Sequence, residues 1–180
     1  MYYLFLAEGF EEVEALTPLD YLRRAGVKIL SVGVTGEYVT GAHGITVKTD
    51  IPLSDVKIGD DLEGIILPGG MPGTKNLEAS MDLSKLLIYA NAHGRLIGAI
   101  CAAPSIPGKL GLLDSKKATC YPGFESTLKM ALPQTDKVVT DGNIITSRGA
   151  GTANEFAFAL IAYIKGKNAA DQIAEGVIFR

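Results

Sequence analysis

The sequence predicts an α/β protein with a mostly parallel sheet that is sandwiched by helices. Short apolar, β-branched runs alternate along the chain with longer amphipathic stretches, and no internal repeat or linker interrupts them. The chain has 180 residues, of which 47% are hydrophobic, and this length and apolar content suit one domain. We therefore place a single domain at residues 1–180.

The first three predicted elements are a strand, a helix and a strand. Residues 3–7 form a short apolar run, which is typical of a buried strand. An amphipathic stretch at residues 11–25 predicts a helix that ends at Gly26. Residues 27–34 predict the second strand. This alternation favours a parallel pair.

The middle of the chain continues the pattern. Residues 37–50 hold two glycines among β-branched residues, which predicts a hairpin at a sheet edge. Residues 64–67 predict a strand, residues 82–93 a helix and residues 96–100 another strand. We expect a short helix after Pro104, because proline fits the first turn of a helix.

The last part of the chain begins with a second hairpin. Residues 137–140 and 143–147 flank Asp141 and Gly142, a pair that is typical of a tight two-residue turn. An apolar-faced helix is expected at residues 151–165, and a short helix at residues 169–175.

Four segments that follow predicted strands are candidates for a functional site. In parallel α/β folds, ligands bind beyond the carboxyl ends of the strands. If the sheet is parallel, the four segments meet at one edge. They are residues 8–14, 68–73, 101–104 and 147–152.

Cys101 is the candidate nucleophile. It stands between a predicted strand and a helix-starting proline, as in a nucleophile elbow, and we expect the helix N-terminus to lower the thiol pKa. The backbone N–H groups of Ala102 and Gly70 would form an oxyanion hole. The alternative is a small buried core cysteine.

Glu14 is the candidate proton partner of this thiol. It follows Glu11 and Glu12. These two residues are explained by the preference for acidic residues in the first turn of a helix. Pro18 has no N–H for the carbonyl of Glu14, so we expect a kink or a helix start near Glu14 that turns its side chain toward the site.

The remaining motifs are weaker. Residues 147–152 either bind an anion at a helix N-terminus or form a tight turn, and we favour the turn. The glycine clusters match no nucleotide-binding fingerprint, and no Cys/His/Asp group has metal-ligand spacing, so we expect neither cofactor nor metal. Cys120 is interpreted as a core residue, with a resolving thiol as the alternative.

Composition narrows the possible partners. A net charge of −3 gives no general attraction for nucleic acid or an anionic membrane. Two cysteines are too few for a disulfide scaffold, and the N-terminal residues lack the basic region of a signal peptide. We expect a cytoplasmic protein without nucleic-acid or membrane partners.

Four motifs also carry a resemblance. AEGFEEVEA, IILPGGMPG, IGAICAAPS and TSRGAGT, in this order and spacing, resemble the ThiJ/PfpI superfamily, in the DJ-one/ThiJ-like branch that holds the Parkinson's-disease protein. The resemblance covers almost the whole chain. It implies a flavodoxin-like fold, related to class I glutamine amidotransferases, and a homodimer. It implies a site made of Cys101 and Glu14 as catalytic residues, Gly69, Gly70 and Ala102 as oxyanion and substrate contacts, and Tyr121, Arg148 and His43 as further lining residues.

The resemblance implies a function as well. It suggests a cofactor-independent glyoxalase or deglycase that acts on small 2-oxoaldehydes, for example methylglyoxal to lactate, through a hemithioacetal at Cys101. The alternative is an oxidative-stress redox sensor or chaperone-like protein in which Cys101 is oxidised and catalyses little.

Several positions depart from the relatives. Tyr121 stands where the Parkinson's-disease protein has a histidine, and Ala102 stands where the protease-like branch has one. No histidine follows His93, although amidotransferases need one, so we do not expect a Cys–His hydrolase. His43 corresponds to an arginine that helps to bind anions in some relatives.

Overall fold

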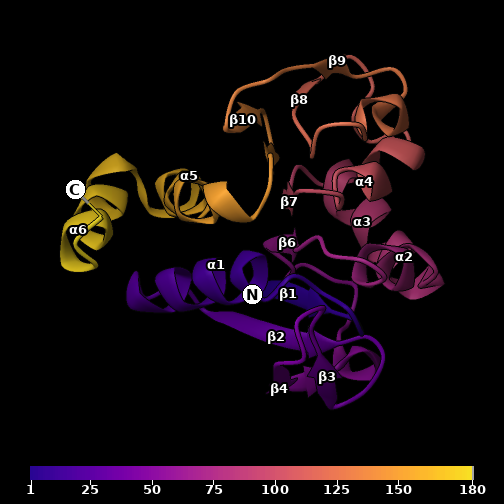
Figure 1. Ribbon diagram of the computed structural model, residues 1–180, viewed down its shortest axis with the longest axis horizontal. Helices are drawn as coiled ribbons and strands as arrows, with labels where there is room; N and C mark the ends of the chain where they lie inside the picture. Colours follow the sequence, from indigo (N-terminus) through magenta and orange to yellow (C-terminus); the bar gives the residue numbers. More distant parts are fainter. Residues whose placement is uncertain (180) are drawn as a thin grey trace.

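A seven-stranded sheet organises the protein in the computed structural model, which describes residues 1–179 (Figure 1). The strand order is β10-β11-β7-β6-β1-β2-β5. All neighbours are parallel except β10 and β11, which form an antiparallel hairpin. The strands are β1 (Tyr2–Leu6), β2 (Ile29–Gly33), β5 (Ile51–Pro52), β6 (Gly64–Leu67), β7 (Leu96–Ile100), β10 (Val138–Asp141) and β11 (Ile144–Ser147). The predicted α/β class with a mostly parallel sheet is confirmed.

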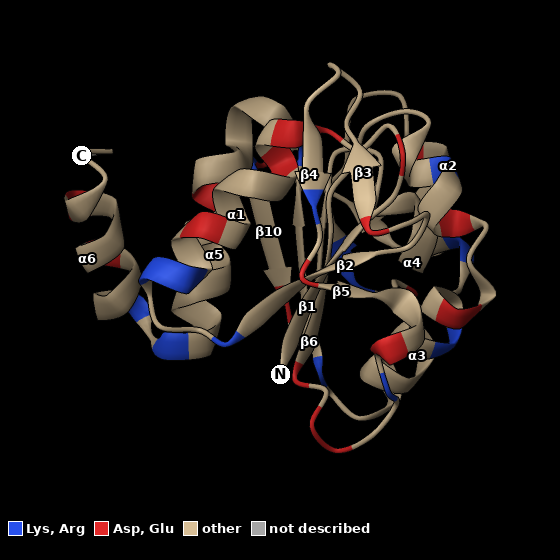
Figure 2. Cartoon of the chain, turned by 90° about the horizontal axis from the view of Figure 1, so that it is seen from below, with Lys and Arg blue, Asp and Glu red and all other residues tan. Residues whose placement is uncertain are grey.

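Helices cover both faces of this sheet (Figure 2). One layer contains α1 (Glu12–Arg24), α5 (Ala153–Lys165) and α6 (Lys167–Gly176), and the other contains α2 (Gly73–Glu78), α3 (Met81–Ala92) and α4 (Ser105–Lys109). Successive residues of a strand point to opposite faces. In β1, Leu4 and Leu6 therefore belong to the hydrophobic cluster that contains Phe156 of α5, whereas Phe5 belongs to the cluster that contains Leu83 of α3. Burial on both faces explains the continuous apolar runs of the central strands.

Short elements complete the fold. The hairpin expected at residues 37–50 is present as β3 (Tyr38–Thr40) and β4 (Thr46–Lys48), but these strands form a sheet of their own, and β5 occupies the edge of the main sheet. Four short elements were not predicted from the sequence, because two to six residues carry no readable periodicity. They are β5, α2 and the parallel pair β8 (Lys117–Ala118) and β9 (Leu132–Pro133). The 3-10 turns are η1 (Leu53–Asp55), η2 (Glu125–Leu128) and η3 (Ala150–Thr152).

The helix α1 positions one of the predicted site residues. It begins at Glu12 and continues past Pro18. Glu14, Pro18 and Leu22 are spaced by four residues and are all buried, so they share the face that packs on the sheet. Helical periodicity directs Glu14 inward, and no helix start at Glu14 itself is needed.

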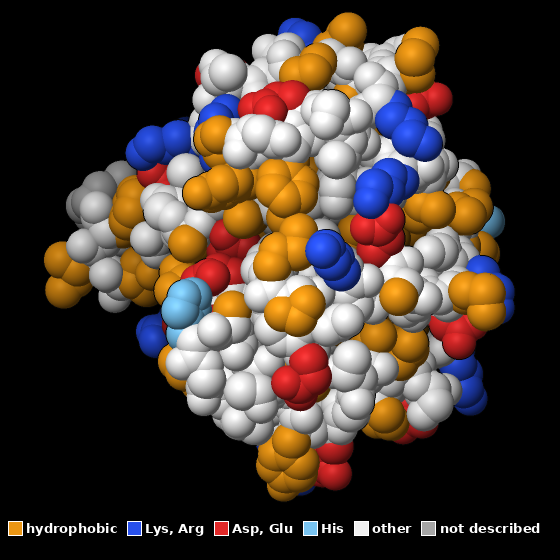
Figure 3. Space-filling model, turned by 45° about the vertical axis from the view of Figure 1, so that its right-hand side comes forward, with side chains coloured by type: hydrophobic (Ala, Val, Ile, Leu, Met, Phe, Trp, Pro, Cys, Tyr) orange, Lys and Arg blue, Asp and Glu red, His pale blue; other side chains and the backbone are white. Residues whose placement is uncertain are grey.

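The surface is mixed in character. On the face that Figure 3 shows, basic, acidic and hydrophobic side chains are interspersed. Among residues 1–179, no helix has both the length and the apolar content that crossing a membrane requires.

Candidate active site

The four segments that follow β1, β6, β7 and β11 meet at one edge of the sheet, as the sequence predicts. The backbone N–H of Glu11 donates to the carbonyl of Gly69 at 3.0 Å, which joins the first two segments. The N–H of Cys101 donates to the carbonyl of Ser147 at 2.9 Å, which joins the other two. Parallel neighbours end at the same edge, so the sheet itself brings these residues together.

Cys101 occupies a sharp turn directly after β7. Its φ of 64° lies in the left-handed region, which costs a residue with a side chain about 1–2 kcal/mol. The turn is fixed on both sides, because the carbonyl of Cys101 also accepts from the N–H of Tyr121 at 2.8 Å. This geometry matches the predicted nucleophile elbow, and backbone strain of this kind is concentrated at functional sites.

Glu14 lies against this thiol and is almost fully buried, with 1% of its surface exposed. Its Oε2 accepts a hydrogen bond from the backbone N–H of Gly69 at 2.8 Å. The Cys101 thiol also hydrogen-bonds to the carboxyl group. No N–H or O–H group of residues 1–179 donates to the buried Oε1. The bond from Gly69 therefore holds the carboxyl group in place, while its other oxygen has no N–H or O–H donor among the described residues.

Burial changes the pKa of both groups. It raises the pKa of Glu14 to about 7, although the Gly69 N–H and the Cys101 thiol act in the opposite direction. Burial, the charge of Glu14 and the hydrogen bond to Glu14 together raise the pKa of the Cys101 thiol to about 12. The N–H groups of Ala102 and Gly70 hydrogen-bond to the sulfur and lower its pKa, but burial outweighs them. The expected net lowering of the thiol pKa is therefore wrong.

The two groups titrate as a pair. One proton leaves the pair near pH 7, and the second stays bound up to about pH 12. Above about pH 7 the pair thus holds one proton, and the two pKa values place this proton on the sulfur. Transfer along their hydrogen bond produces a thiolate beside a neutral acid. The N–H groups of Ala102 and Gly70 favour that form, so a thiolate can arise at this site without a histidine.

Glycines allow the close approach of these groups. A Cβ on Gly69 would lie 2.7 Å from both Cys101 Cβ and Glu14 Oε2. Gly149, in the turn after β11, lies next to Tyr121 and Glu14, since its Cβ would be 3.4 Å from the Tyr121 ring and 3.9 Å from Glu14 Oε1. Gly69 was predicted as a site residue, whereas Gly149 was not, although it lies in the predicted candidate segment 147–152.

A small cavity of about 170 Å³ opens above the sulfur. It is lined by Gly70, Met71, Cys101, Ala102, Tyr121 and Phe124. The rings of Tyr121 and Phe124 meet edge to face, with centroids 6.4 Å apart. Tyr121 was predicted as a lining residue, whereas Met71 and Phe124 were missed because a methionine or phenylalanine in a loop carries no chemical signature.

Comparison with known protein families gives a match over most of the chain. The model of the DJ-1/PfpI family matches residues 2–163. This chain belongs to the DJ-1/PfpI family.

Individual DJ-1/PfpI relatives match over most of the chain. Protein DJ-1 homolog B of Arabidopsis thaliana is 38% identical over 178 residues, which cover 97% of this chain and 40% of that protein; the chain thus spans less than half of that relative. The glutathione-independent glyoxalase DJR-1.2 of Caenorhabditis elegans is 34% identical, with 88% of this chain and 85% of that protein covered. Oxidised Toxoplasma gondii DJ-1 superposes with a TM-score of 0.94 and 35% identity, over 98% of this chain and 97% of that one.

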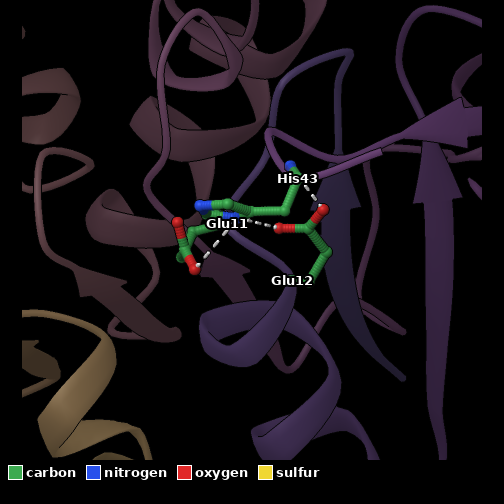
Figure 4. Close-up of side chains that lie close together, drawn as sticks. All are labelled: Glu11, Glu12 and His43. Carbon is green, nitrogen blue, oxygen red and sulfur yellow. Dashed lines mark hydrogen bonds and ion pairs between the residues drawn. The ribbon is translucent and has the colours of Figure 1, made fainter. Parts of the chain in front are cut away.

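His43 and Arg148 lie beside the pair of Cys101 and Glu14 rather than in the cavity above the sulfur. His43 faces Glu12, with 2.8 Å between Nδ1 and Oε2, and Glu11 Oε1 is 3.7 Å from the same nitrogen (Figure 4). Arg148 and Tyr121 line an adjoining, more open hollow of about 370 Å³. Neither His43 nor Arg148 is among the residues that line the cavity above Cys101.

The Glu11, Glu12 and His43 cluster combines side chains that can bind a metal ion, and their ligand atoms lie within 4.8 Å of one another. The spacing of residues in the sequence did not predict this cluster, because His43 lies in the β3–β4 loop, far along the chain from Glu11 and Glu12. His43 already bonds to Glu12 with both its backbone N–H and its ring. The N-terminus of α1 also disfavours an added cation. We interpret the cluster as an ion pair that ties the hairpin to α1.

Cys120 is separate from this chemistry. It is 1% exposed and packs in the hydrophobic cluster on the α3 side of the sheet. Cys101 packs against the cluster on the α1 and α5 side. Burial raises the pKa of Cys120 to about 11. These observations favour the core interpretation over that of a resolving thiol.

Proposed function

We propose that this DJ-1/PfpI protein converts small 2-oxoaldehydes such as methylglyoxal to 2-hydroxy acids without a cofactor. The observation that carries the proposal is the hydrogen-bonded pair of the partly exposed Cys101 and the buried Glu14, whose first proton leaves near neutral pH. The name of the Caenorhabditis elegans relative, a glutathione-independent glyoxalase, supports it.

The first step is addition to the aldehyde. The Cys101 proton moves to Glu14, and the sulfur forms a bond to the aldehyde carbon. The C=O electron pair moves to the oxygen, where the N–H groups of Gly70 and Ala102 stabilise the negative charge. Proton return from Glu14 gives a neutral hemithioacetal and restores the carboxylate.

The second step moves a hydrogen between adjacent carbons. The Glu14 carboxylate removes the proton from the sulfur-bearing carbon, which gives an enediolate, and returns it to the neighbouring carbon. The hydroxyl proton passes from the first oxygen to the second, which leaves a thioester and a 2-hydroxyl group. The first carbon is oxidised by two electrons and the second is reduced by two, so no external oxidant or reductant is needed. One acid/base group with a pKa near 7 is sufficient for both transfers.

The third step is hydrolysis. Water adds to the resulting thioester, and the C–S bond breaks. The products are the 2-hydroxy acid and the free thiol of Cys101. The sum of the three steps converts the 2-oxoaldehyde and one water molecule to the 2-hydroxy acid.

The test is methylglyoxal consumption and lactate formation without glutathione. Cys101→Ala and Glu14→Gln are expected to abolish turnover, whereas the matched control Cys120→Ala retains it. The proposal fails if the wild-type protein, with Cys101 confirmed reduced, produces no lactate.

A second candidate function is redox sensing. Cys101 is partly exposed to solvent, and the Toxoplasma gondii structure is described as oxidised. Two molecules of hydrogen peroxide would oxidise the thiol through a sulfenic acid to a sulfinate and be reduced to water, and a protonated Glu14 would donate a hydrogen bond to a sulfinate oxygen on Cys101. Mass spectrometry after mild peroxide treatment tests this function. Sulfinate at Cys101 together with negligible lactate formation supports it, whereas an unmodified Cys101 excludes it.

A further inference from the structure

We propose that the preferred substrate of the Cys101 site carries an aromatic group on its 2-oxo carbon, so that arylglyoxals react better than methylglyoxal. This inference rests on the proposed function and specifies its substrate class. It comes from the walls of the cavity, where Met71, Tyr121 and Phe124 provide the surface beyond the reacting sulfur.

The position of the reacting atoms directs the substituent of the substrate to one wall of the cavity, which consists of Met71, Tyr121 and Phe124. Once the aldehyde carbon is bonded to Cys101, its oxygen faces the N–H groups of Gly70 and Ala102, which hydrogen-bond to the same sulfur. Gly70 and Ala102 are themselves lining residues of the cavity. The rest of the 2-oxoaldehyde then lies against Met71, Tyr121 and Phe124.

The wall is suited to an aromatic ring. The edge-to-face pair of Tyr121 and Phe124 offers the arrangement into which a third ring packs favourably. The Met71 thioether is a polarisable contact for the same ring. The volume of about 170 Å³ is below that of drug-sized sites, which start at about 300 Å³, so the cavity suits a single ring.

The cavity also disfavours charged substituents. Within residues 1–179, none of its six lining residues is charged. Arg148 lies along the adjoining hollow instead. A phosphorylated or carboxylated aldehyde would therefore lose solvation without gaining a counter-charge in this cavity. A neutral apolar substituent has no comparable solvation to lose, and the burial of its surface in the cavity favours binding.

The first experiment compares kcat/KM for phenylglyoxal, measured by mandelate formation, with kcat/KM for methylglyoxal. Each value is divided by the rate of uncatalysed hemithioacetal formation with a small thiol, which removes the difference in intrinsic electrophilicity. The corrected ratio is expected to favour phenylglyoxal by about tenfold or more. Met71→Ala and Phe124→Leu are expected to lower this ratio several-fold. The matched control Met81→Ala, at a methionine that is 77% exposed at the start of α3, keeps it unchanged.

A second experiment tests whether an aromatic group binds against Met71, Tyr121 and Phe124, and it does not depend on turnover. Acetophenone is expected to slow the alkylation of Cys101 by iodoacetamide more than acetone does, and Phe124→Leu removes the difference. Equal protection by both ketones overturns the inference. A corrected ratio near one with sustained lactate formation overturns the inference and leaves the proposed function intact. Selective protection by acetophenone without any turnover supports the aromatic site and overturns the proposed function.

Discussion

The backbone N–H of Gly69 donates to Oε2 of Glu14 at 2.8 Å, and this bond joins α1 to the loop after β6. The same loop supplies Gly70, whose N–H faces the Cys101 sulfur. The acid/base group and one oxyanion donor are therefore positioned by two adjacent residues. A change in this loop alters both the proton partner and the charge-stabilising groups.

The pH dependence of turnover is the first prediction. The active form of the pair holds one proton, and that form becomes dominant as the pH rises through about 7. In the wild-type protein, kcat/KM for methylglyoxal is expected to rise about tenfold per pH unit below 7 and to level off above it. Stopped-assay measurements of lactate between pH 5 and 9 check this.

Glu11→Gln is the matched variant for this profile. The charge of Glu11 raises the pKa of Glu14, so its removal is expected to shift the midpoint to lower pH while the plateau is retained. A profile with no inflection near neutral pH in the wild type, or a midpoint that moves upward in Glu11→Gln, contradicts the role given to Glu14.

The second prediction concerns the glycine between the two reacting groups. Gly69→Ala places a Cβ 2.7 Å from both Cys101 Cβ and Glu14 Oε2, so these groups must separate. Displacements of this kind cost about 100-fold in kcat/KM. Gly151→Ala is the control, because a Cβ there meets no atom within 4 Å. Comparable turnover in the two variants would show that the close packing of the pair is not required.

Much of this architecture is predictable from the sequence. The apolar runs at β6, β7 and β11 and the residues that follow them identify Cys101 and Gly70, because strand position fixes where they lie. Helical spacing with Pro18 and Leu22 places Glu14 on the buried face of α1. These relationships are local or follow from one rule of topology.

Other features depend on distances between segments that no spacing encodes. Phe124 reaches the cavity through an irregular segment, and His43 meets Glu12 because a loop folds back onto α1. The sign of the thiol pKa shift was also unpredictable. A helix N-terminus and burial act in opposite directions, and only the packed structure shows that burial is larger.

The third prediction tests the backbone strain at Cys101. Cys101→Ala and Cys101→Gly both delete the thiol, but only glycine adopts a φ of 64° without steric cost. Relief of about 1–2 kcal/mol, less the extra flexibility of glycine in the unfolded chain, leaves Cys101→Gly more stable than Cys101→Ala by about 0.5–1 kcal/mol. Urea denaturation measures this difference.

Ala103→Gly is the control for this comparison, since Ala103 is buried and has no positive φ. There, glycine is expected to lower the free energy of unfolding. If Cys101→Gly is less stable than Cys101→Ala, the left-handed conformation at this turn carries no strain.

The fourth prediction concerns the ion pair between His43 and Glu12. The hydrogen bond to Glu12 raises the pKa of His43 above its ordinary value of 6.5. Burial opposes ionisation of Glu12, but the hydrogen bonds from His43 lower the pKa of Glu12 below 4.5. A raised histidine pKa stabilises the fold fully below 6.5, and this contribution is lost as the pH rises through the folded pKa. The depressed pKa of Glu12 contributes above 4.5 and is lost at lower pH.

Thermal unfolding of wild type and His43→Gln therefore diverges most between about pH 5 and 6.5, and the two melting temperatures approach each other above pH 8. A double-mutant cycle with Glu12→Gln separates the pair from the backbone bond that His43 also makes to Glu12. The coupling between the two side chains should weaken as the pH rises. A coupling that is constant from pH 5 to 9 would mean that the neutral imidazole holds the hairpin to α1 as well as the charged one does.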